Sequence, residues 1–132
     1  MGRNKHLTRE EVLRAYARAV NRRTVESLEP LLAEGFHYAS QMVLDEIESK
    51  EEFLEYLAGK LRTIERAGQP VWAEMGELRI EFPGPCVIVA QGTKDNLVGV
   101  VLAEVDGERI RRLDMCVVPS PHSAIRSGEY PD

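Results

Sequence analysis

The hydrophobic pattern of this chain changes character once, near Pro70. Before that residue, apolar side chains mostly recur at the three- and four-residue spacing of amphipathic helices. After it, they form short runs separated by turn residues, as in strands. Helices that precede a run of consecutive strands favour an α+β fold, in which the helices cover one face of a largely antiparallel sheet. The 132 residues, 43% of them hydrophobic, supply enough apolar material for one such core.

The helical part of the pattern predicts three helices, over residues 8–23, 24–32 and 49–68. Thr8 and Glu11 form a capping box at the start of the first helix, and Ser49 begins the third in the same way. Pro30 removes a backbone donor inside the second segment, so we expect a kink there or two separate turns.

The strand part of the pattern predicts strands over residues 36–43, 71–82, 86–93, 97–105 and 109–118. Asp106 and Gly107, between the last two strands, form a two-residue sequence that favours a tight hairpin. The final segment contains Pro119, Pro121 and Pro131 and few apolar residues, so we expect a loosely attached coil. The sequence therefore predicts a single domain at residues 1–118 and a C-terminal coil tail at residues 119–132.

Charge and composition argue against several classes of partner. The chain has 17 Lys and Arg against 22 Asp and Glu, a formal net charge of −5, and no run of basic residues, so nucleic acid is not an expected partner. No apolar stretch approaches the roughly 20 residues that cross a bilayer. Cys86 and Cys116 both lie in apolar, strand-like runs. Buried reduced thiols and a cytoplasmic location are expected, with a disulfide as the alternative.

The order and length of these elements resemble the nuclear transport factor 2-like superfamily, which includes ketosteroid isomerase and small polyketide cyclases. The resemblance covers roughly residues 7–118. Locally, it rests on Ala-Tyr-Ala-Arg-Ala-Val-Asn at residues 15–21 and Leu-Leu-Ala-Glu at residues 31–34. It implies a cone-shaped domain, in which a curved, mainly antiparallel (mixed) sheet wraps around the helices and encloses a pocket. Such sheets often pair back to back.

The position of the turn in the last hairpin predicts which residues of its two strands pair with each other. If Asp106-Gly107 is the turn, opposing residues have numbers that sum to 213, and each pair shares a face. One face then carries Ala103 with Ile110, Val101 with Arg112, Gly99 with Asp114, and Leu97 with Cys116. Both faces are substantially apolar, and short helices can cover only one. We therefore expect a second copy of the chain on the outer sheet face, that is, a homodimer.

The face that carries Arg112, Asp114 and Cys116 is the expected pocket face, because the resemblance places it on the cavity. Gly99 would leave open volume opposite Asp114. The candidate lining residues are Tyr38, Ser40, Met42, Trp72, Gly99, Val101 and Cys116. An alternative remains open, in which Arg112 and Asp114 neutralise each other as a structural pair.

Tyr16 matches the helix-one tyrosine of ketosteroid isomerase, which donates a hydrogen bond to a developing oxyanion. A neutral phenol suits that role, although a core tyrosine is the alternative. The position of the isomerase's base aligns with Ser40, and its second oxyanion donor falls near Val101. Neither residue can do the work of a carboxylate, so steroid-type proton shuttling is not expected.

Two functional interpretations follow for a pocket that takes a small organic molecule. The first is cofactor-independent acid–base chemistry, such as isomerisation, cyclisation or dehydration, with Asp114 as proton carrier, Tyr16 as oxyanion donor and Arg112 tuning Asp114. The alternative is a non-enzymatic ligand-binding module or a dimeric protein-interaction module. Whether the chain is an enzyme stays open.

The remaining motifs in the sequence give weaker evidence of function. Tyr56 and Lys60 are spaced like the Tyr-x-x-x-Lys of short-chain dehydrogenases, but no Gly-rich loop accompanies them, so a nicotinamide site is not expected. His37 is out of phase with the pocket positions on its strand. Glu46 and Glu48 belong to an acidic run that we interpret as a solvated loop. The spacing of His, Cys and Asp predicts neither a metal site nor a cofactor.

Overall fold

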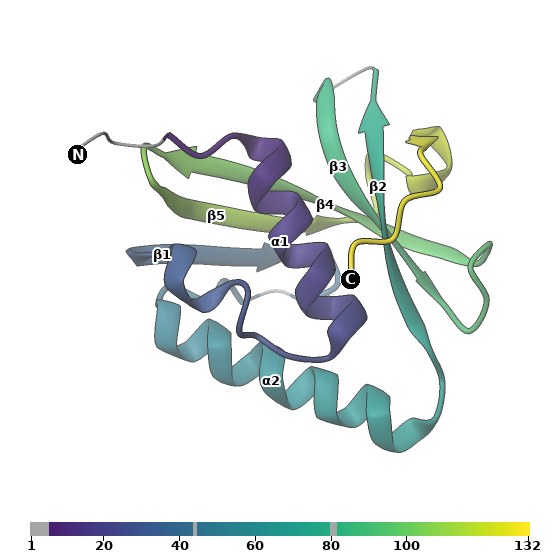
Figure 1. Cartoon of the computed structure of the whole chain (residues 1–132), viewed down its shortest axis with the longest axis horizontal. Helices are drawn as coiled ribbons and strands as arrows, with labels where there is room; N and C mark the ends of the chain where they lie inside the picture. The colour runs from purple at the N-terminus through teal and green to yellow at the C-terminus, as the bar shows by residue number, and fades with distance from the viewer. Residues whose placement is uncertain (1–5, 44, 80–81) are drawn as a thin grey trace.

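The computed structural model describes residues 6–43, 45–79 and 82–132. The elements in chain order are α1 (Arg9–Arg22), a 3₁₀ turn η1 (Glu29–Leu31), β1 (Leu32–Ser40), α2 (Lys50–Ala67), β2 (Val71–Leu78), β3 (Gly84–Gln91), β4 (Leu97–Asp106), β5 (Arg109–Cys116), a second 3₁₀ turn η2 (Pro121–Ser123) and β6 (Ile125–Arg126). Figure 1 shows α1 lying across the sheet, α2 lying beyond β1, and the C-terminal segment returning to β2.

All six strands form one mixed sheet in the order β1-β5-β4-β3-β2-β6. β1 runs parallel to β5, and the other neighbours are antiparallel. Helix α1 packs on β2, β3 and β4, whereas α2 packs on β1, so both helices cover the same face. The expectation of an α+β fold with a curved, mainly antiparallel sheet is therefore confirmed.

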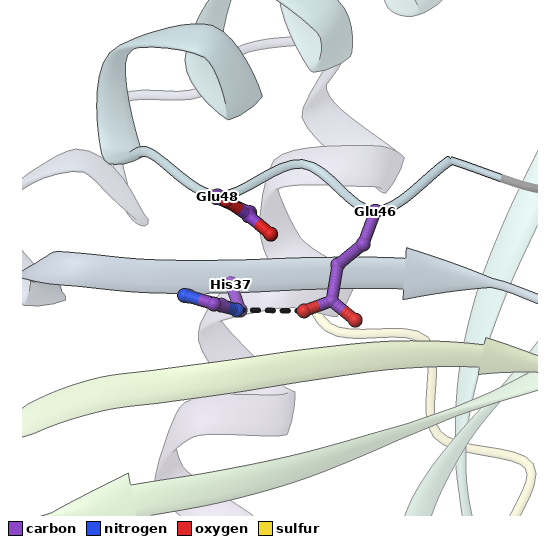
Figure 2. A group of neighbouring side chains, drawn as sticks. All are labelled: His37, Glu46 and Glu48. Atoms are coloured by element: carbon purple, nitrogen blue, oxygen red, sulfur yellow. Dashed lines mark hydrogen bonds and ion pairs between the residues drawn. The ribbon is translucent and has the colours of Figure 1, made fainter.

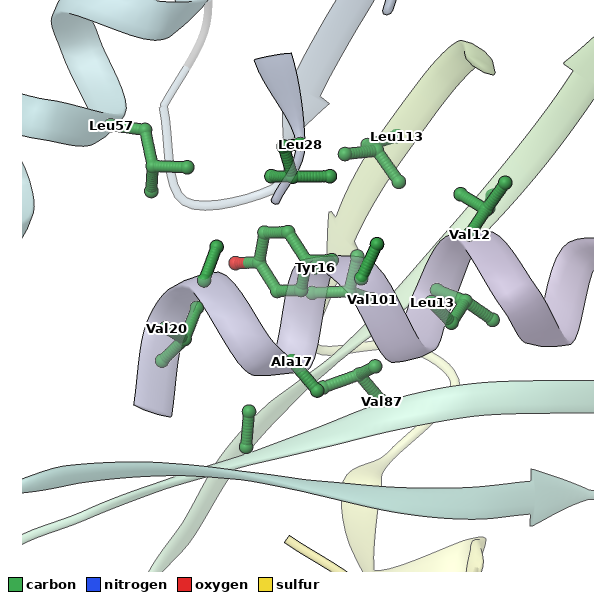
Figure 3. Packing of buried hydrophobic residues seen from close by; sticks show 14 of the residues in the cluster. Val12, Leu13, Tyr16, Ala17, Val20, Leu28, Leu57, Val87, Val101 and Leu113 are labelled. Atoms are coloured by element: carbon green, nitrogen blue, oxygen red, sulfur yellow. The ribbon is translucent and has the colours of Figure 1, made fainter. Parts of the chain in front are cut away.

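The main core lies between α1 and the sheet (Figure 3). The capping box at Thr8 and Glu11 forms as predicted, with the Glu11 amide donating to the Thr8 hydroxyl at 3.1 Å. Helix α1 then buries Val12, Leu13, Tyr16, Ala17 and Val20 against inward-facing strand residues. We call this helix-covered surface the inner face of the sheet, and the opposite surface the outer face.

The expected count of three helices is wrong, because the segment before β1 forms two separate turns, which was one of the alternatives that Pro30 suggested. The Glu29 amide donates to the Val25 carbonyl at 3.0 Å in the first turn, and the second turn is η1. Pro30 lies in the first turn of η1 and cannot donate the backbone hydrogen bond that a longer helix needs. The backbone becomes extended at Leu32, where β1 begins and pairs with Ile110 of β5. The strand therefore starts earlier than the expected residue 36, and it ends at Ser40.

The C-terminal segment is not loosely attached, contrary to the expectation from its prolines. β6 pairs with β2, and the Met75 amide donates to the Glu129 carbonyl at 2.9 Å. The carboxylate of Glu74, which is only 3% exposed, accepts from Arg126 Nε at 2.9 Å and from the Gly128 amide at 2.7 Å. A buried acid on β2 thus holds the segment, and composition gave no sign of this anchor.

The predicted register of the β4–β5 hairpin is also wrong. The two-residue turn is Gly107-Glu108, with Gly107 at φ 63°, and Asp106 pairs with Arg109. A β-bulge then leaves Arg111 without a partner residue, because Val105 pairs with Ile110 and Glu104 with Arg112.

The bulge has a packing reason. Ile110 and Leu113 are both fully buried, yet they are three residues apart, and strict alternation would place them on opposite faces. The extra residue brings both into the core and turns Arg112 and Asp114 to the outer face. Cys116 follows them into a separate outer cluster with Leu78, Cys86, Ile88 and Val100.

Candidate functional site

A small cavity lies on the inner face, between α1, α2 and the sheet, with a volume of about 60 Å³. Its walls are mostly apolar, with three phenols and one amine, and the lining residues are Tyr16, Val20, Tyr38, Phe53, Tyr56, Leu57, Lys60, Leu61, Ile64, Val71, Val89 and Met115. A water needs roughly 10–15 Å³ of such space, so the cavity has room for several waters or a compact organic group.

Tyr16 lines this cavity from α1, as its match to the isomerase tyrosine implied. The residue is 7% exposed, and its hydroxyl makes no hydrogen bond to any residue in the part of the chain that the structure describes. Fully buried side-chain polar atoms among those residues all have partners. The Tyr16 hydroxyl therefore keeps contact with the cavity itself.

Tyr38 reaches the same cavity from β1. Its ring packs against Phe53 and Tyr56 of α2, with centroids 5.0 and 5.6 Å away. Burial raises the pKa of Tyr38 well above its usual value, and the neighbouring Tyr16 and Tyr56 add to this effect. Burial also raises the pKa of Tyr16. Both phenols are therefore neutral hydrogen-bond donors at physiological pH.

Tyr56 and Lys60 form the rim of the cavity on α2. Lys60 Nζ donates to the Tyr56 hydroxyl at 3.1 Å and lies 5.4 Å from the centre of its ring. The spacing of this pair in the sequence suggested only a comparison with nicotinamide sites. Its place beside the buried stripe Phe53, Leu57 and Leu61 was the signal that both side chains border the core.

Gly99 and Val101 do not open the cavity further. Val101 is fully buried in the core. A side chain at Gly99 would meet Met115 Sδ at 3.1 Å, so Met115 fills the volume that the sequence suggested was open. Met115 itself lines the cavity.

Three further candidates lie away from the cavity. The Ser40 hydroxyl accepts from the Met42 amide at 3.1 Å at the end of β1, and Met42 is 52% exposed. Trp72 borders a different depression together with Asn21 and Tyr130.

Arg112 and Asp114 lie on the outer face and bind each other, with 2.9 Å between Arg112 Nε and Asp114 Oδ2. This contact agrees with the alternative interpretation, in which Arg112 and Asp114 neutralise each other as a structural pair. Cys116 is also on the outer face, and burial raises the pKa of its thiol. The structure thus brings Tyr16 and Tyr38 together and places Asp114 on the other side of the sheet.

His37 lies outside the cavity, as its phase on the strand predicted. Together with Glu46 and Glu48 it forms the one cluster of possible metal ligands found in residues 6–43, 45–79 and 82–132. None of the three residues lines the cavity between α1 and α2.

Comparisons with known proteins identify the fold. No family model matches the sequence, and no curated protein matches it either. Among solved structures, the chain is similar to a nuclear transport factor 2-like protein of unknown function from Cytophaga hutchinsonii, with a TM-score of 0.56 and 14% identity. The match covers 87% of this chain and 96% of that one. At this identity, the likeness concerns the fold.

Proposed function

We propose that this chain, which has a nuclear transport factor 2-like fold, binds a compact carbonyl compound in the cavity between α1, α2 and the sheet. Tyr16 donates a hydrogen bond to the carbonyl oxygen, and the apolar walls bury the rest of the molecule. Tyr38 and Tyr56 supply further hydroxyls for a second polar group of the ligand.

The observation that carries this proposal is the Tyr16 hydroxyl, which faces an apolar cavity without a protein partner among the described residues. The Tyr16 hydroxyl is open to the cavity, so it can donate a hydrogen bond to a molecule bound there. A neutral phenol donor favours a carbonyl oxygen over a cation.

Ligand binding is better supported than acid–base catalysis. Among the described residues, those that line the cavity include no carboxylate and no imidazole. Asp114, the expected proton carrier, lies on the outer face and is engaged by Arg112. Isomerisation, cyclisation or dehydration would therefore need a proton carrier other than Asp114, and Tyr56 with Lys60 is the pair at the rim.

A screen of small ketones by ligand-observed NMR tests the proposal. We expect saturable binding to the unmodified chain and about tenfold weaker binding to Tyr16→Phe, which loses one buried hydrogen bond. Tyr130→Phe, a change outside the cavity, is the matched control and should bind as the unmodified chain does. Equal binding by the Tyr16→Phe variant would contradict the proposal.

A homodimer through the outer face is a second proposal, and it has its own observation. Phe82 and Val118 are 59% and 64% exposed, and both border an outer cleft of about 380 Å³ floored by Leu102 and Cys116. The C-terminal segment covers part of this face, where η2 contacts β4 and Ala124 packs against the outer cluster. A second copy would bury the remainder.

We further propose a cytoplasmic location. Cys86 and Cys116 are free and buried, and burial raises the pKa of the Cys86 thiol to about 11. Such thiols are inert and suit a reducing compartment. In the described part of the chain, no helix has both the length and the apolar character for crossing a membrane.

A further inference from the structure

A second group of chemically active side chains lies at the β1 edge of the sheet. His37 is on β1, and Glu46 and Glu48 flank Ile47 in the segment before α2. Ile47 and Tyr38 exchange two backbone hydrogen bonds of 2.8 Å, so this segment pairs with β1 as a short antiparallel partner.

The pairing sets the direction of the side chains. Tyr38 and Ile47 both pack against the inner-face core. Because side chains alternate along extended backbone, their neighbours His37, Glu46 and Glu48 turn the other way. Figure 2 shows the three side chains gathered on one side of β1, with the imidazole of His37 directed at the Glu46 carboxylate.

The donor atoms are close enough to share an ion. One ligand atom from each residue lies within 4.8 Å of the others, and His37 Nδ1 is 2.6 Å from Glu46 Oε2. A tetrahedral zinc ion with bonds near 2.0 Å separates its donors by about 3.3 Å. Rotation of the half-exposed His37 imidazole and of the exposed Glu48 side chain provides the adjustment.

The surrounding charges favour a divalent ion. Arg112 donates to Glu46 at 3.3 Å and to Asp114 at 2.9 Å, and the Glu48 carboxylate lies beside Glu46, so among these four side chains one cation stands against three carboxylates. With a neutral imidazole, this group carries two excess negative charges.

Arg112 also has a place in such a site. Metal-binding carboxylates are commonly held from behind by a second hydrogen-bonding group. Arg112 donates hydrogen bonds to both Glu46 oxygens, and its charge is neutralised by Asp114. It therefore holds the Glu46 carboxylate in place without adding a net charge.

From these contacts we infer that His37, Glu46 and Glu48 bind one divalent transition-metal ion, with zinc as the best match. One imidazole nitrogen and two carboxylate oxygens suit zinc, cobalt or nickel, whereas calcium and magnesium prefer oxygen ligands alone. Water completes the coordination. The ion would tie the segment around Ile47 to β1, independently of the cavity on the inner face. Sequence spacing missed the site because only the β1 pairing unites its ligands.

Calorimetric titration of the chelator-treated full chain with zinc chloride tests this inference. We expect one zinc per chain and no binding of magnesium chloride at the same concentration. His37→Ala should weaken zinc binding by about 100-fold or more, and Glu48→Gln by at least about tenfold. His122→Ala removes another exposed imidazole and should leave zinc binding unchanged. Circular dichroism of each variant checks the fold.

Cobalt offers a second readout that does not depend on affinity. A visible absorption band on adding cobalt chloride reports coordination by the protein, and it should be lost in His37→Ala and kept in His122→Ala. The inference is overturned if the unmodified chain shows no saturable zinc binding, if His37→Ala binds zinc as tightly as the unmodified chain, or if His122→Ala loses binding equally.

Discussion

Asp114 on β5 lies directly opposite Leu102 on β4, on the face of the sheet that the helices leave uncovered. Tyr16 packs against the other face. A molecule that accepts a hydrogen bond from Tyr16 is therefore separated from Asp114 by the sheet itself. The chemistry available in the cavity comes from phenols and one amine, and Asp114 serves an ion pair at the surface.

Asp114→Asn should leave ligand binding in the cavity unchanged within about twofold. The substitution removes a half-buried ion pair with Arg112, which costs up to about 1 kcal/mol of the free energy of unfolding. Ligand-observed NMR and urea denaturation measure the two effects. If the Asp114→Asn variant lost binding while remaining folded, the division between the two faces would be wrong.

The C-terminal segment should depend on Glu74. In Glu74→Ala, Arg126 and the Gly128 amide lose their buried acceptor. We expect a loss of about 2–4 kcal/mol in the free energy of unfolding and faster hydrogen exchange at residues 125–129. Glu77→Ala, on the same strand but exposed, should change stability by less than about 0.5 kcal/mol. Equal effects of the two substitutions would rule out the anchor.

The proposed dimer should depend on Val118. Light scattering is expected to show a dimer for the unmodified chain and a monomer for Val118→Glu, because a charge at this exposed site opposes burial of the outer face. Thr63→Glu adds the same charge on the exposed side of α2 and should remain dimeric. A monomeric unmodified chain, or a dimeric Val118→Glu variant, would contradict this proposal.

The ionisation of Tyr16 and Tyr38 gives a pH prediction. Burial raises the pKa of both phenols in the folded chain above the usual value of 10.0. The unfolded chain loses these protons near pH 10, so the free energy of unfolding should fall as the pH rises above about 10. Tyrosinate absorbance should show two of the four tyrosines ionising only when the chain unfolds. Ionisation of all four near pH 10 in the folded state would contradict the buried placement.

Much of the fold could be predicted from local patterns. The capping box at Thr8 and the apolar stripes of α1 and α2 are signals within one helix, and the structure contains both helices. The failures came from tertiary effects. Ile110 and Leu113 are three residues apart in a strand, and this spacing was the available sign of a bulge. One extra residue was enough to move Arg112, Asp114 and Cys116 to the outer face.

The candidate site was predictable only in part, for the same reason. The side on which Tyr16 and Tyr38 lie could be predicted, because it depends on the periodicity within one helix or one strand. The face on which Asp114 lies depends on the register between β4 and β5, which the sequence pattern of one strand does not determine. The attachment of the C-terminal segment depends on the buried Glu74, and in the sequence pattern of its strand Glu74 looks like an ordinary polar residue.

The most direct test of the central claim is a crystal structure of the chain soaked with a ketone small enough for the cavity, such as acetone. The account predicts density for the ketone between α1 and α2, with its oxygen within hydrogen-bond distance of the Tyr16 hydroxyl, and no such density in Tyr16→Phe at the same concentration. A cavity closed by its own side chains in the soaked crystal, or a ketone bound only on the outer face beside Asp114, would contradict it.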